Sequence, residues 1–472
     1  MAAALAAAAA QRGTAPPHPV PGAGAEPGFD AALSAARFGN PLSLMMAGVL
    51  ALDDGPGAVL ALRRLDAARR LARRELHRLK ELGGPGEAPA VTHLAAFNGL
   101  AGGLPVAGLT ATLTAELATA GLAGDAGRLA SLLQQDLPAE ERAGEAGGAA
   151  AHLGTVQPDL IGEGLILEAL SGEPAVEAGA TGLVQRAYAL TGARAAGALM
   201  RLLHDYAYAL EDATASDAER ADAGRLMAWL RALAERLDDP AALAPLVEAL
   251  PEHTTILRED ALALTERMAA AARAALAAAP DDPDATAAAA LWLNNLSNRL
   301  SDLGRREDAL AAIEGAVEAY RILAAARPDA VRPNLAVALT NLSNCLSALG
   351  RREEALAAIQ EAVAIRRDLA AARPDAFRPD LSVSLGAQAD IRRARNEPDE
   401  ALAAHAEAIA LLRPLFLKLP GAVAQWMVMH LQRYFELTEE LGAAPDETLL
   451  APILETLQKL QKGGGGGEHP KR

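Results

Sequence analysis

Few side chains in this sequence are arranged in a way that could do covalent or metal chemistry. The nine histidines never form a His-x-x-x-His or His-Glu-x-x-His pair, the spacing that presents two zinc ligands on one helix face. Cys345 is the single cysteine, which excludes an internal disulfide and any multi-cysteine zinc site. No lysine stands in the Gly-Lys-Ser or Gly-Lys-Thr context of a phosphate-binding loop, and a Gly-x-Ser-x-Gly nucleophile elbow is absent. The sequence therefore predicts no enzyme and calls for no cofactor or metal ion.

Composition and charge favour an acidic protein built of helices. Of 472 residues 51% are hydrophobic but only 3% are aromatic, and the formal net charge is −16. Alanine and leucine are abundant, and together with the many arginines and glutamates they favour helices over sheets. Nucleic-acid-binding proteins carry a basic surface, so a sequence pI of about 5.1 argues against nucleic acid as a partner. The arginine row of a helix expected at residues 60–82 is then predicted to be a solvated face, with a nucleic-acid contact as the alternative.

Neither the start of the chain nor its least charged stretch predicts export or a membrane span. The alanine-rich start lacks the basic residues that precede the apolar part of a secretory signal, since the first basic residue is Arg12. Residues 94–115 are uncharged, but their glycines, proline, asparagine and threonines are typical of a buried helical segment. We therefore expect a cytoplasmic protein with no membrane partner.

The C-terminal half of the sequence repeats itself. Residues 293–304, LNNLSNRLSDLG, recur 46 residues later at 339–350 as LTNLSNCLSALG. A third copy keeps Leu385 and Ala408 but has Asn396 where the first two copies have glycine, and a looser copy begins at Arg258. A repeat of this length indicates similar supersecondary units that stack on one another.

Each unit is predicted to be a pair of antiparallel helices. In the second copy, the leucines between residues 339 and 349 lie three or four residues apart and so share one helix face. Gly350 ends this helix, because glycine accepts the left-handed conformation of a helix cap. The second helix runs from about Arg352 to Ala372, with Ile359 and Val363 facing inwards. One pair cannot bury its apolar face alone, so consecutive copies must form a solenoid.

The repeat resembles the tetratricopeptide repeat (TPR) family. The turn glycine, the alanine five residues after it and another alanine seven residues further on match the small positions of that family. The unit is longer than usual because its second helix is extended, as in repeats of the kinesin-light-chain type, which also favour a Leu-Asn-Asn-Leu start. Ser297 and Ser343 replace the family's glycine, and Leu300 and Leu346 replace its tyrosine. These departures change packing detail and leave the fold expectation standing.

Family members bind extended peptides in a concave groove lined by the first helix of each pair, where asparagines grip the peptide backbone. The residues that match these sites by position, or lie on or beside the same face, are Asn294, Asn295, Asn298, Ser301, Thr340, Asn341, Asn344 and Ser347. The alternative is that they solvate an exposed helix face or bond between repeats. Net hydrogen bonds contribute only about 1 kcal/mol each, so a ligand would also need an apolar anchor, which we do not locate in the sequence.

The N-terminal half resembles the arm of signal-transduction ATPases of the STAND class, which includes the NB-ARC and bacterial antiphage types. Gly39-Asn-Pro41 is similar to their Gly-x-Pro motif, and residues 89–160 to their winged-helix domain. The resemblance implies that Pro41 contacts a nucleotide and makes His152 the nearest candidate for a phosphate sensor. The nucleotide-binding core should lie before Gly39, where the sequence has no Walker loop. An ATPase core would therefore have to associate in cis or in trans.

Together these features predict an all-α protein, a winged-helix-like helical region followed by a superhelical TPR solenoid. The first functional hypothesis is a non-enzymatic interaction or sensor module that binds a protein or peptide in the groove. The second is the sensor arm of a nucleotide-dependent switch in transcriptional regulation or antiphage defence, and the third and weakest is an unrecognised hydrolase. The expected segments are a disordered leader (1–30), a helical subdomain (31–88), the winged-helix-like region (89–160), a helical connector with degenerate repeats (161–255), the TPR array (256–440) and a terminal helix with a glycine-rich tail (441–472).

Overall fold

The structure is a computed structural model that describes residues 45–47, 49–51, 63–139, 151–171, 174–251 and 254–463. Pro41 and the expected leader lie outside these residues. The chain divides into two compact units, unit 1 up to Ile256 and unit 2 from Leu257 onwards. In the described ranges the secondary structure is helical apart from one isolated bridge between Pro105 and His152. The all-α fold class is confirmed for this part of the chain.

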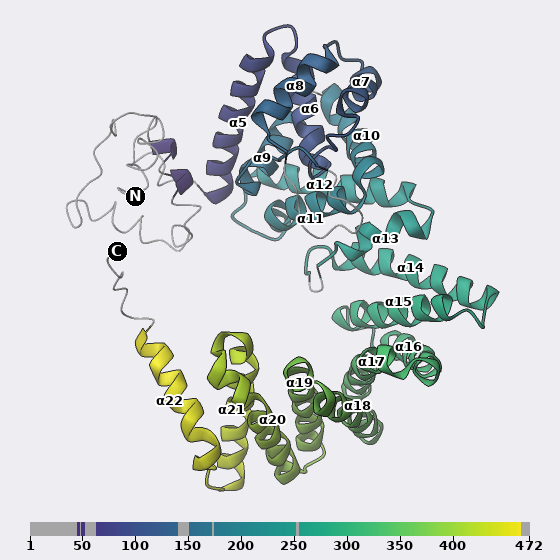
Figure 1. Cartoon of the computed structure of the whole chain (residues 1–472), viewed down its shortest axis with the longest axis vertical. Coiled ribbons are helices and arrows are strands. Elements are labelled where there is room, and N and C mark those ends of the chain that lie inside the picture. The colour runs from purple at the N-terminus through teal and green to yellow at the C-terminus, as the bar shows by residue number, and fades with distance from the viewer. Residues whose placement is uncertain are drawn as a thin grey trace. The chain divides into compact units, whose positions relative to one another are not determined.

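Unit 1 is a cluster of helices around α9 (Figure 1). Its labelled helices are α5 (Arg64–Gly83), α6 (Ala88–Leu100), α7 (Leu109–Ala120), α8 (Ala126–Asp136), α9 (Asp159–Ala169), α10 (Pro174–Thr191), α11 (Ala193–Tyr206), the 3-10 helix η2 (Ala207–Leu210), α12 (Asp217–Arg236) and α13 (Pro240–Glu248). Helix α5 packs against α9, and α6 contacts both of them. The leucines of α5 that lie at helical spacing, from Leu65 to Leu79, are buried in this core.

Proline and glycine set the helix boundaries in unit 1. Helix α5 ends at Gly83, and Gly84 has a positive φ of 82°, which a glycine accepts without strain. Helix α7 begins only at Leu109. Pro105 instead pairs with His152, and Gly108 turns the chain into the helix with a φ of 72°. The uncharged stretch 94–115 is therefore two helices joined by a turn.

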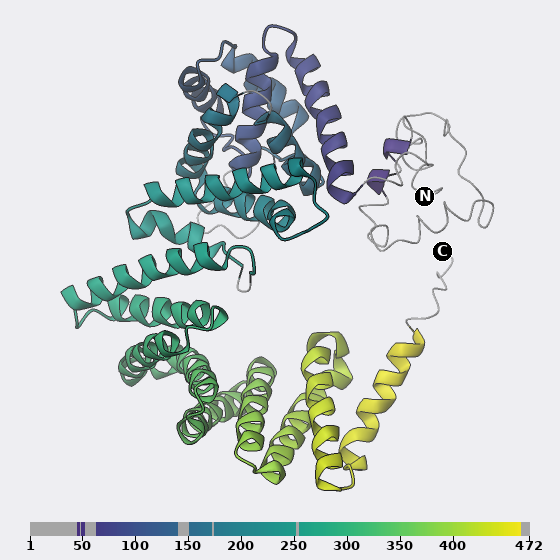
Figure 2. The ribbon, with the colours of Figure 1, turned by 180° about the vertical axis from the view of Figure 1, so that it is seen from behind.

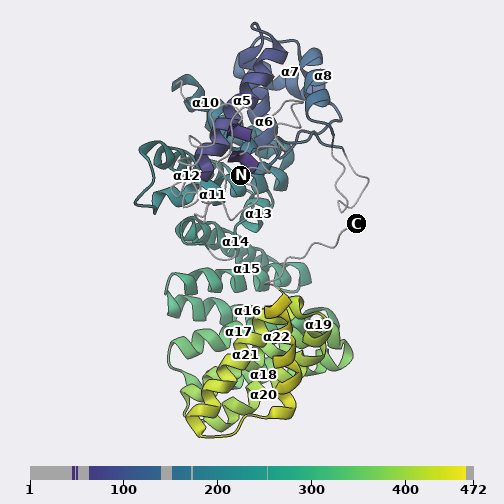
Figure 3. The ribbon, with the colours of Figure 1, turned by 90° about the vertical axis from the view of Figure 1, so that its left-hand side faces the viewer.

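Unit 2 is a stack of helices in chain order. They are α14 (Arg258–Ala278), α15 (Pro283–Asp302), α16 (Arg306–Ala326), α17 (Pro328–Ala348), α18 (Arg352–Ala372), α19 (Pro374–Ala394), α20 (Pro398–Lys418), α21 (Pro420–Leu441) and α22 (Glu447–Gly463). From α14 to α21 each helix packs against the next, as Figures 2 and 3 show from two further sides. The first helices α15, α17, α19 and α21 also contact one another in succession. This arrangement confirms the repeat solenoid.

The turns and cores of the pairs follow the repeat. Gly304 and Gly350 have φ values of 73° and 76°, and Asn396 takes the same left-handed conformation with a φ of 64°. Asparagine is among the few residues other than glycine that visit this region readily, which explains why the third copy keeps its turn. In α18, Ile359 and Val363 are buried as predicted. The buried face of this second helix therefore packs within the stack, between α17 and α19.

The C-terminal end of unit 2 has an apolar core of its own. Phe416 of α20, Met427 of α21 and Ile453 of α22 are all fully buried in one cluster. Helix α22 packs on α20 and covers apolar surface that a further repeat would otherwise cover. A terminal helix of this kind caps the described end of the stack.

Candidate functional site

Equivalent residues of the first helices share one outward stripe, which we call the first-helix face. A helix places residues i, i+4 and i+7 above one another. The face comprises Leu291, Asn295 and Asn298 of α15; Val337, Asn341 and Asn344 of α17; Val383, Ala387 and Asp390 of α19; and Met429, Arg433 and Glu436 of α21. Each of these residues is exposed or half-buried. The face thus runs along the first helices of four consecutive pairs, and each of these first helices touches the next.

The structure divides the eight predicted binding residues into three groups. Asn298, Asn344 and Ser301 are exposed. Asn295, Asn341 and Ser347 are half-buried. The remaining two, Asn294 and Thr340, are buried at 9% and 8% exposure. Two of the eight are therefore not presented on the surface.

Asn294 and Thr340 hold neighbouring repeats together. Asn341 Nδ2 of α17 donates a hydrogen bond of 3.0 Å to Asn294 Oδ1 of α15. The Thr340 hydroxyl donates to the carbonyl oxygen of Ala336 at 2.8 Å and lies 3.5 Å from Ser384 Oγ on α19. At these positions the structure therefore favours the alternative stated above, in which the side chains bond between repeats. An amide that already forms such a hydrogen bond has fewer donors and acceptors left for a ligand.

Cys345 also belongs to the contact between α15 and α17. Its thiol lies 3.6 Å from Ser297 Oγ and 3.7 Å from Ser301 Oγ, and the residue is 6% exposed. The buried thiol and the two hydroxyls therefore form part of the packing between neighbouring repeats. Ser301 is therefore both exposed to solvent and part of this packing contact.

The first-helix face contains apolar residues that our sequence reasoning missed. Leu291, Val337, Val383 and Met429 are 45%, 42%, 37% and 41% exposed. They lie 46 residues apart, so the same offset that revealed the repeat also marks them. Periodicity alone does not identify them as exposed, because it shows only that the positions are equivalent, whereas exposure depends on how the helices stack.

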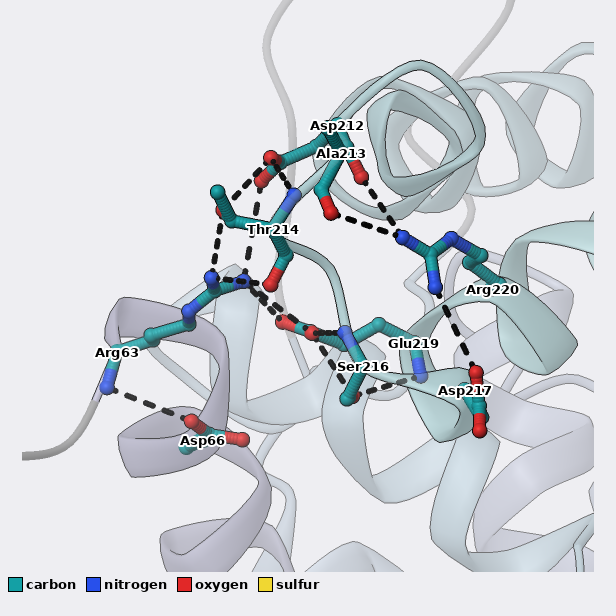
Figure 4. Close-up of polar contacts among 9 residues, drawn as sticks. All are labelled: Arg63, Asp66, Asp212, Ala213, Thr214, Ser216, Asp217, Glu219 and Arg220. Atoms are coloured by element: carbon teal, nitrogen blue, oxygen red, sulfur yellow. Dashed lines mark hydrogen bonds and ion pairs between the residues drawn. The ribbon is translucent and has the colours of Figure 1, made fainter.

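The arginine row of α5 is engaged within unit 1. Figure 4 shows the guanidinium of Arg63, just before α5, donating to the Thr214 carbonyl oxygen at 2.6 Å and to the Thr214 hydroxyl at 2.7 Å. Arg63 also pairs with Glu219 at 3.3 Å. Glu219 in turn accepts from the backbone N–H of Ser216 at 2.6 Å and so caps α12. This network joins the starts of α5 and α12.

Further along α5, Arg69 pairs with Glu168 at 2.8 Å and with the buried Asp222. Arg78 donates to Asp136 at 2.6 Å, and its carboxylate partners raise its pKa above the usual value. Arginines that neutralise carboxylates of the same unit offer less positive charge to phosphates. The solvated-face prediction therefore needs correction, since part of this row forms ion pairs inside the unit.

A buried carboxyl group lines a cavity of about 780 Å³ in unit 1. Glu163 of α9 is 5% exposed, and burial together with a hydrogen bond to Asp205 raises its pKa to about 9. Arg201 Nε lies 3.8 Å from Glu163 Oε1. Burial and the neighbouring Asp205 therefore favour the protonated form of Glu163, in which its carboxyl group can donate a hydrogen bond to Asp205. No sequence pattern pointed to this pair, because the two residues come from different helices.

Three other expectations concern the winged-helix-like region, metal sites and membrane spans. The described part of residues 89–160 consists of α6, α7, α8 and the Pro105–His152 bridge, without a strand, and His152 is buried. No cluster of three or more His, Cys, Asp or Glu side chains suited to a metal ion occurs among the residues that were placed. Within the same ranges, every helix is too short or too polar to cross a bilayer.

Comparisons with known proteins assign the chain to no family and return solved structures of low similarity. No protein-family profile and no curated protein matches it. Similar solved structures include BtubC (BKLC) from P. vanneervenii, at 14% identity and a TM-score of 0.33 over 58% of this chain and 95% of that one. TTC0263, a thermophilic TPR protein of Thermus thermophilus, has 20% identity and a TM-score of 0.25 over 51% and 99%. Yeast Tom70 has 13% identity and a TM-score of 0.24 over 90% and 94%. Scores this low carry no functional argument, and the assignment of a TPR-like helical repeat protein rests on the repeats of the chain itself.

Proposed function

We propose that unit 2 is a protein-interaction module that binds a peptide segment of another protein on the first-helix face. The observation that carries this proposal is the exposure of Asn298 and Asn344 at equivalent positions of α15 and α17. Amides at a regular spacing can donate to and accept from successive backbone groups of a bound chain. The module acts by binding and without catalysis, as a scaffold or sensor.

The test replaces both exposed amides. The full chain and its Asn298→Ala/Asn344→Ala variant are used to capture partners from the cells that contain the protein. We expect the variant to lose a partner while its thermal unfolding is unchanged, because both side chains are exposed. Gln360→Ala is the matched control, since Gln360 is an exposed amide on the second helix α18. Retention of every partner by the double variant would contradict the proposal.

A second proposal is that the chain is the sensor arm of a nucleotide-dependent switch of the STAND type, with an ATPase core in cis or in trans. Its support is the order of the sequence motifs, in which Gly39-Asn-Pro41 and the 89–160 region precede the repeats. The test is the intact mass of the native protein captured with an antibody to the repeats. A mass well above 48.6 kDa, or an ATPase that co-purifies in fixed ratio, would favour the switch over the simple module.

A further inference from the structure

A row of exposed apolar side chains crosses the first-helix face. Leu291, Val337, Val383 and Met429 occupy one position of four successive helices, and all are more than one-third exposed. In each helix the next residue is buried, and these residues are Trp292, Ala338, Ser384 and His430. Single exposed apolar residues need no explanation, but an aligned row leaves apolar surface in water at the same place in every repeat. Solvation alone does not account for such a row.

The spacing of the row suits an extended chain. Successive first helices are in contact, and packed helix axes lie about 8–10 Å apart. An extended peptide rises about 3.3 Å per residue, so about three residues span one step of the row. Asn298 and Asn344, the exposed amides of the face, lie two helical turns beyond Leu291 and Val337. A helical ligand would already have its backbone groups paired, whereas an extended one offers them to these amides.

The charges around the row favour a basic ligand. Asp380 and Asp390 of α19 are exposed on either side of Val383. Two nearby arginines pair with carboxylates of unit 2, Arg393 with Glu440 at 2.8 Å and Arg433 with Glu436 at 2.9 Å. The chain as a whole has a formal net charge of −16. Complementary charge would therefore speed association with a cationic segment and disfavour an acidic one.

We propose that Leu291, Val337, Val383 and Met429 are the apolar anchors of an extended, basic peptide segment that carries an apolar side chain at about every third residue. This inference rests on the proposed function of unit 2 and specifies the chemistry of its ligand. The anchors would supply the apolar contact that hydrogen bonds to asparagine leave missing.

The test uses the full chain and defined synthetic peptides. The probe is a fluorescein-labelled dodecapeptide of four Leu-Arg-Ser triplets, and binding is followed by fluorescence anisotropy. We expect saturable binding, at least about tenfold weaker binding of the Leu-Glu-Ser counterpart, and weakening with added salt. A peptide of the same composition with its leucines spaced for one face of a helix should also bind about tenfold more weakly. Failure of the Leu-Arg-Ser probe to bind, or preference for either competitor, would overturn the proposal.

Variants then locate the binding. Val337→Asp/Val383→Asp should weaken binding of the Leu-Arg-Ser probe at least about tenfold. The variant should still fold, because valine and aspartate have similar helix propensities. Ile322→Asp is the matched control, since Ile322 is 60% exposed on the second helix α16 and its equivalent one repeat later is already Asp368. If circular dichroism shows that the aspartate variant is misfolded, Val337→Ala/Val383→Ala replaces it, with a loss of about fivefold expected. Undiminished binding of the probe by the folded variant would show that these four residues are not the anchors.

The capture of cellular partners distinguishes a failure of the apolar anchors from a failure of the proposed function of unit 2. If Asn298→Ala/Asn344→Ala loses the cellular partner and Val337→Asp/Val383→Asp retains it, the binding function of the first-helix face is supported and the proposed apolar anchors are contradicted. If both variants retain the partner, the proposed function itself fails. If both lose it and Ile322→Asp does not, both proposals hold.

Discussion

Asn341 of α17 donates a hydrogen bond of 3.0 Å to Asn294 of α15, which ties the first helices of consecutive repeats to each other. The acceptor is buried, and the donor is half-buried on the first-helix face. One asparagine of the repeat motif therefore stabilises the stack, whereas Asn298 on the next turn faces solvent. Residues three or four positions apart on one helix have different surroundings because the adjacent repeat covers only one of them.

The first prediction concerns this amide pair. Asn294→Ala should destabilise the protein by about 1 kcal/mol, because it removes one hydrogen bond and leaves the Asn341 amide partly unpaired. The free energy of unfolding lost in the Asn294→Ala/Asn341→Ala double variant should be smaller than the sum of the losses in the two single variants. The difference, which is the coupling energy of the pair, should be about 0.5–1 kcal/mol. Urea unfolding followed by circular dichroism measures all four proteins. Strictly additive costs would show that the pair contributes nothing to stability.

The second prediction concerns the turn inside a repeat. Gly350 has a φ of 76°, so Gly350→Ala should cost about 1 kcal/mol through strain alone, because the space around it is open. Gly421 near the start of α21 also has open space but no positive φ. Gly421→Ala should therefore stabilise the protein by about 0.5 kcal/mol. Thermal unfolding should move the Tm in opposite directions for the two variants, and a shift of the same sign would contradict the backbone argument.

The third prediction concerns pH. His405 of α20 and His430 of α21 are buried with their Nδ1 atoms 3.0 Å apart, so one neutral ring donates to the other. Burial lowers the pKa of each histidine to about 4, and for His405 the adjacent His430 adds to the effect. An unfolded histidine has a pKa of about 6.5. The unfolded chain therefore takes up protons first as the pH falls.

The contribution of this pair to stability should be complete above about pH 6.5 and should decline as the pH falls towards 4. The loss is at most on the order of 3 kcal/mol per histidine, at about 1.4 kcal/mol per pKa unit. The measurement compares the Tm of the native protein with that of His405→Gln/His430→Gln across this range. Glutamine can donate and accept without titrating, so the variant should lose less stability in acid. Parallel curves would show that the histidines are not the titrating groups.

The fourth prediction concerns unit 1. Glu116 of α7 is 4% exposed and accepts hydrogen bonds of 2.8 and 2.7 Å from Arg186 of α10, while its Oε1 lies 2.7 Å from His93 Nε2. Burial alone would raise the pKa of this carboxyl, but Arg186 and His93 more than offset it and hold the pKa below its usual value. Arg186→Ala would leave a buried carboxylate short of partners and should destabilise the unit by about 2–4 kcal/mol.

Hydrogen exchange in α7 and α10 reports this loss locally, and protection there should fall. Removing the charge as well, in Arg186→Ala/Glu116→Gln, should restore part of the protection, because an amide costs less to bury than an unpaired carboxylate. A double variant that is less protected than Arg186→Ala would contradict the argument.

Much of unit 2 could be predicted from the sequence because its contacts are local. The offset of 46 residues, the leucine spacing and Gly350 defined the pairs, and α18 begins at Arg352 and ends at Ala372 as expected. Unit 1 was less predictable, as its boundaries depend on distant contacts. The residues before α7 are not helical, since Pro105 pairs with His152, which follows α8 in the sequence.

The sequence by itself determined that the chain is helical and that its C-terminal half is a stack of equivalent pairs, because glycine turns and helical spacing act between near neighbours. Only the tertiary structure decided which equivalent residues meet each other and which meet water. It buried Asn294 beside Asn341, left Asn298 exposed and aligned Val337 with Val383 on one face. The physical reason is that burial depends on the helix that packs alongside, and no spacing within one helix specifies that neighbour.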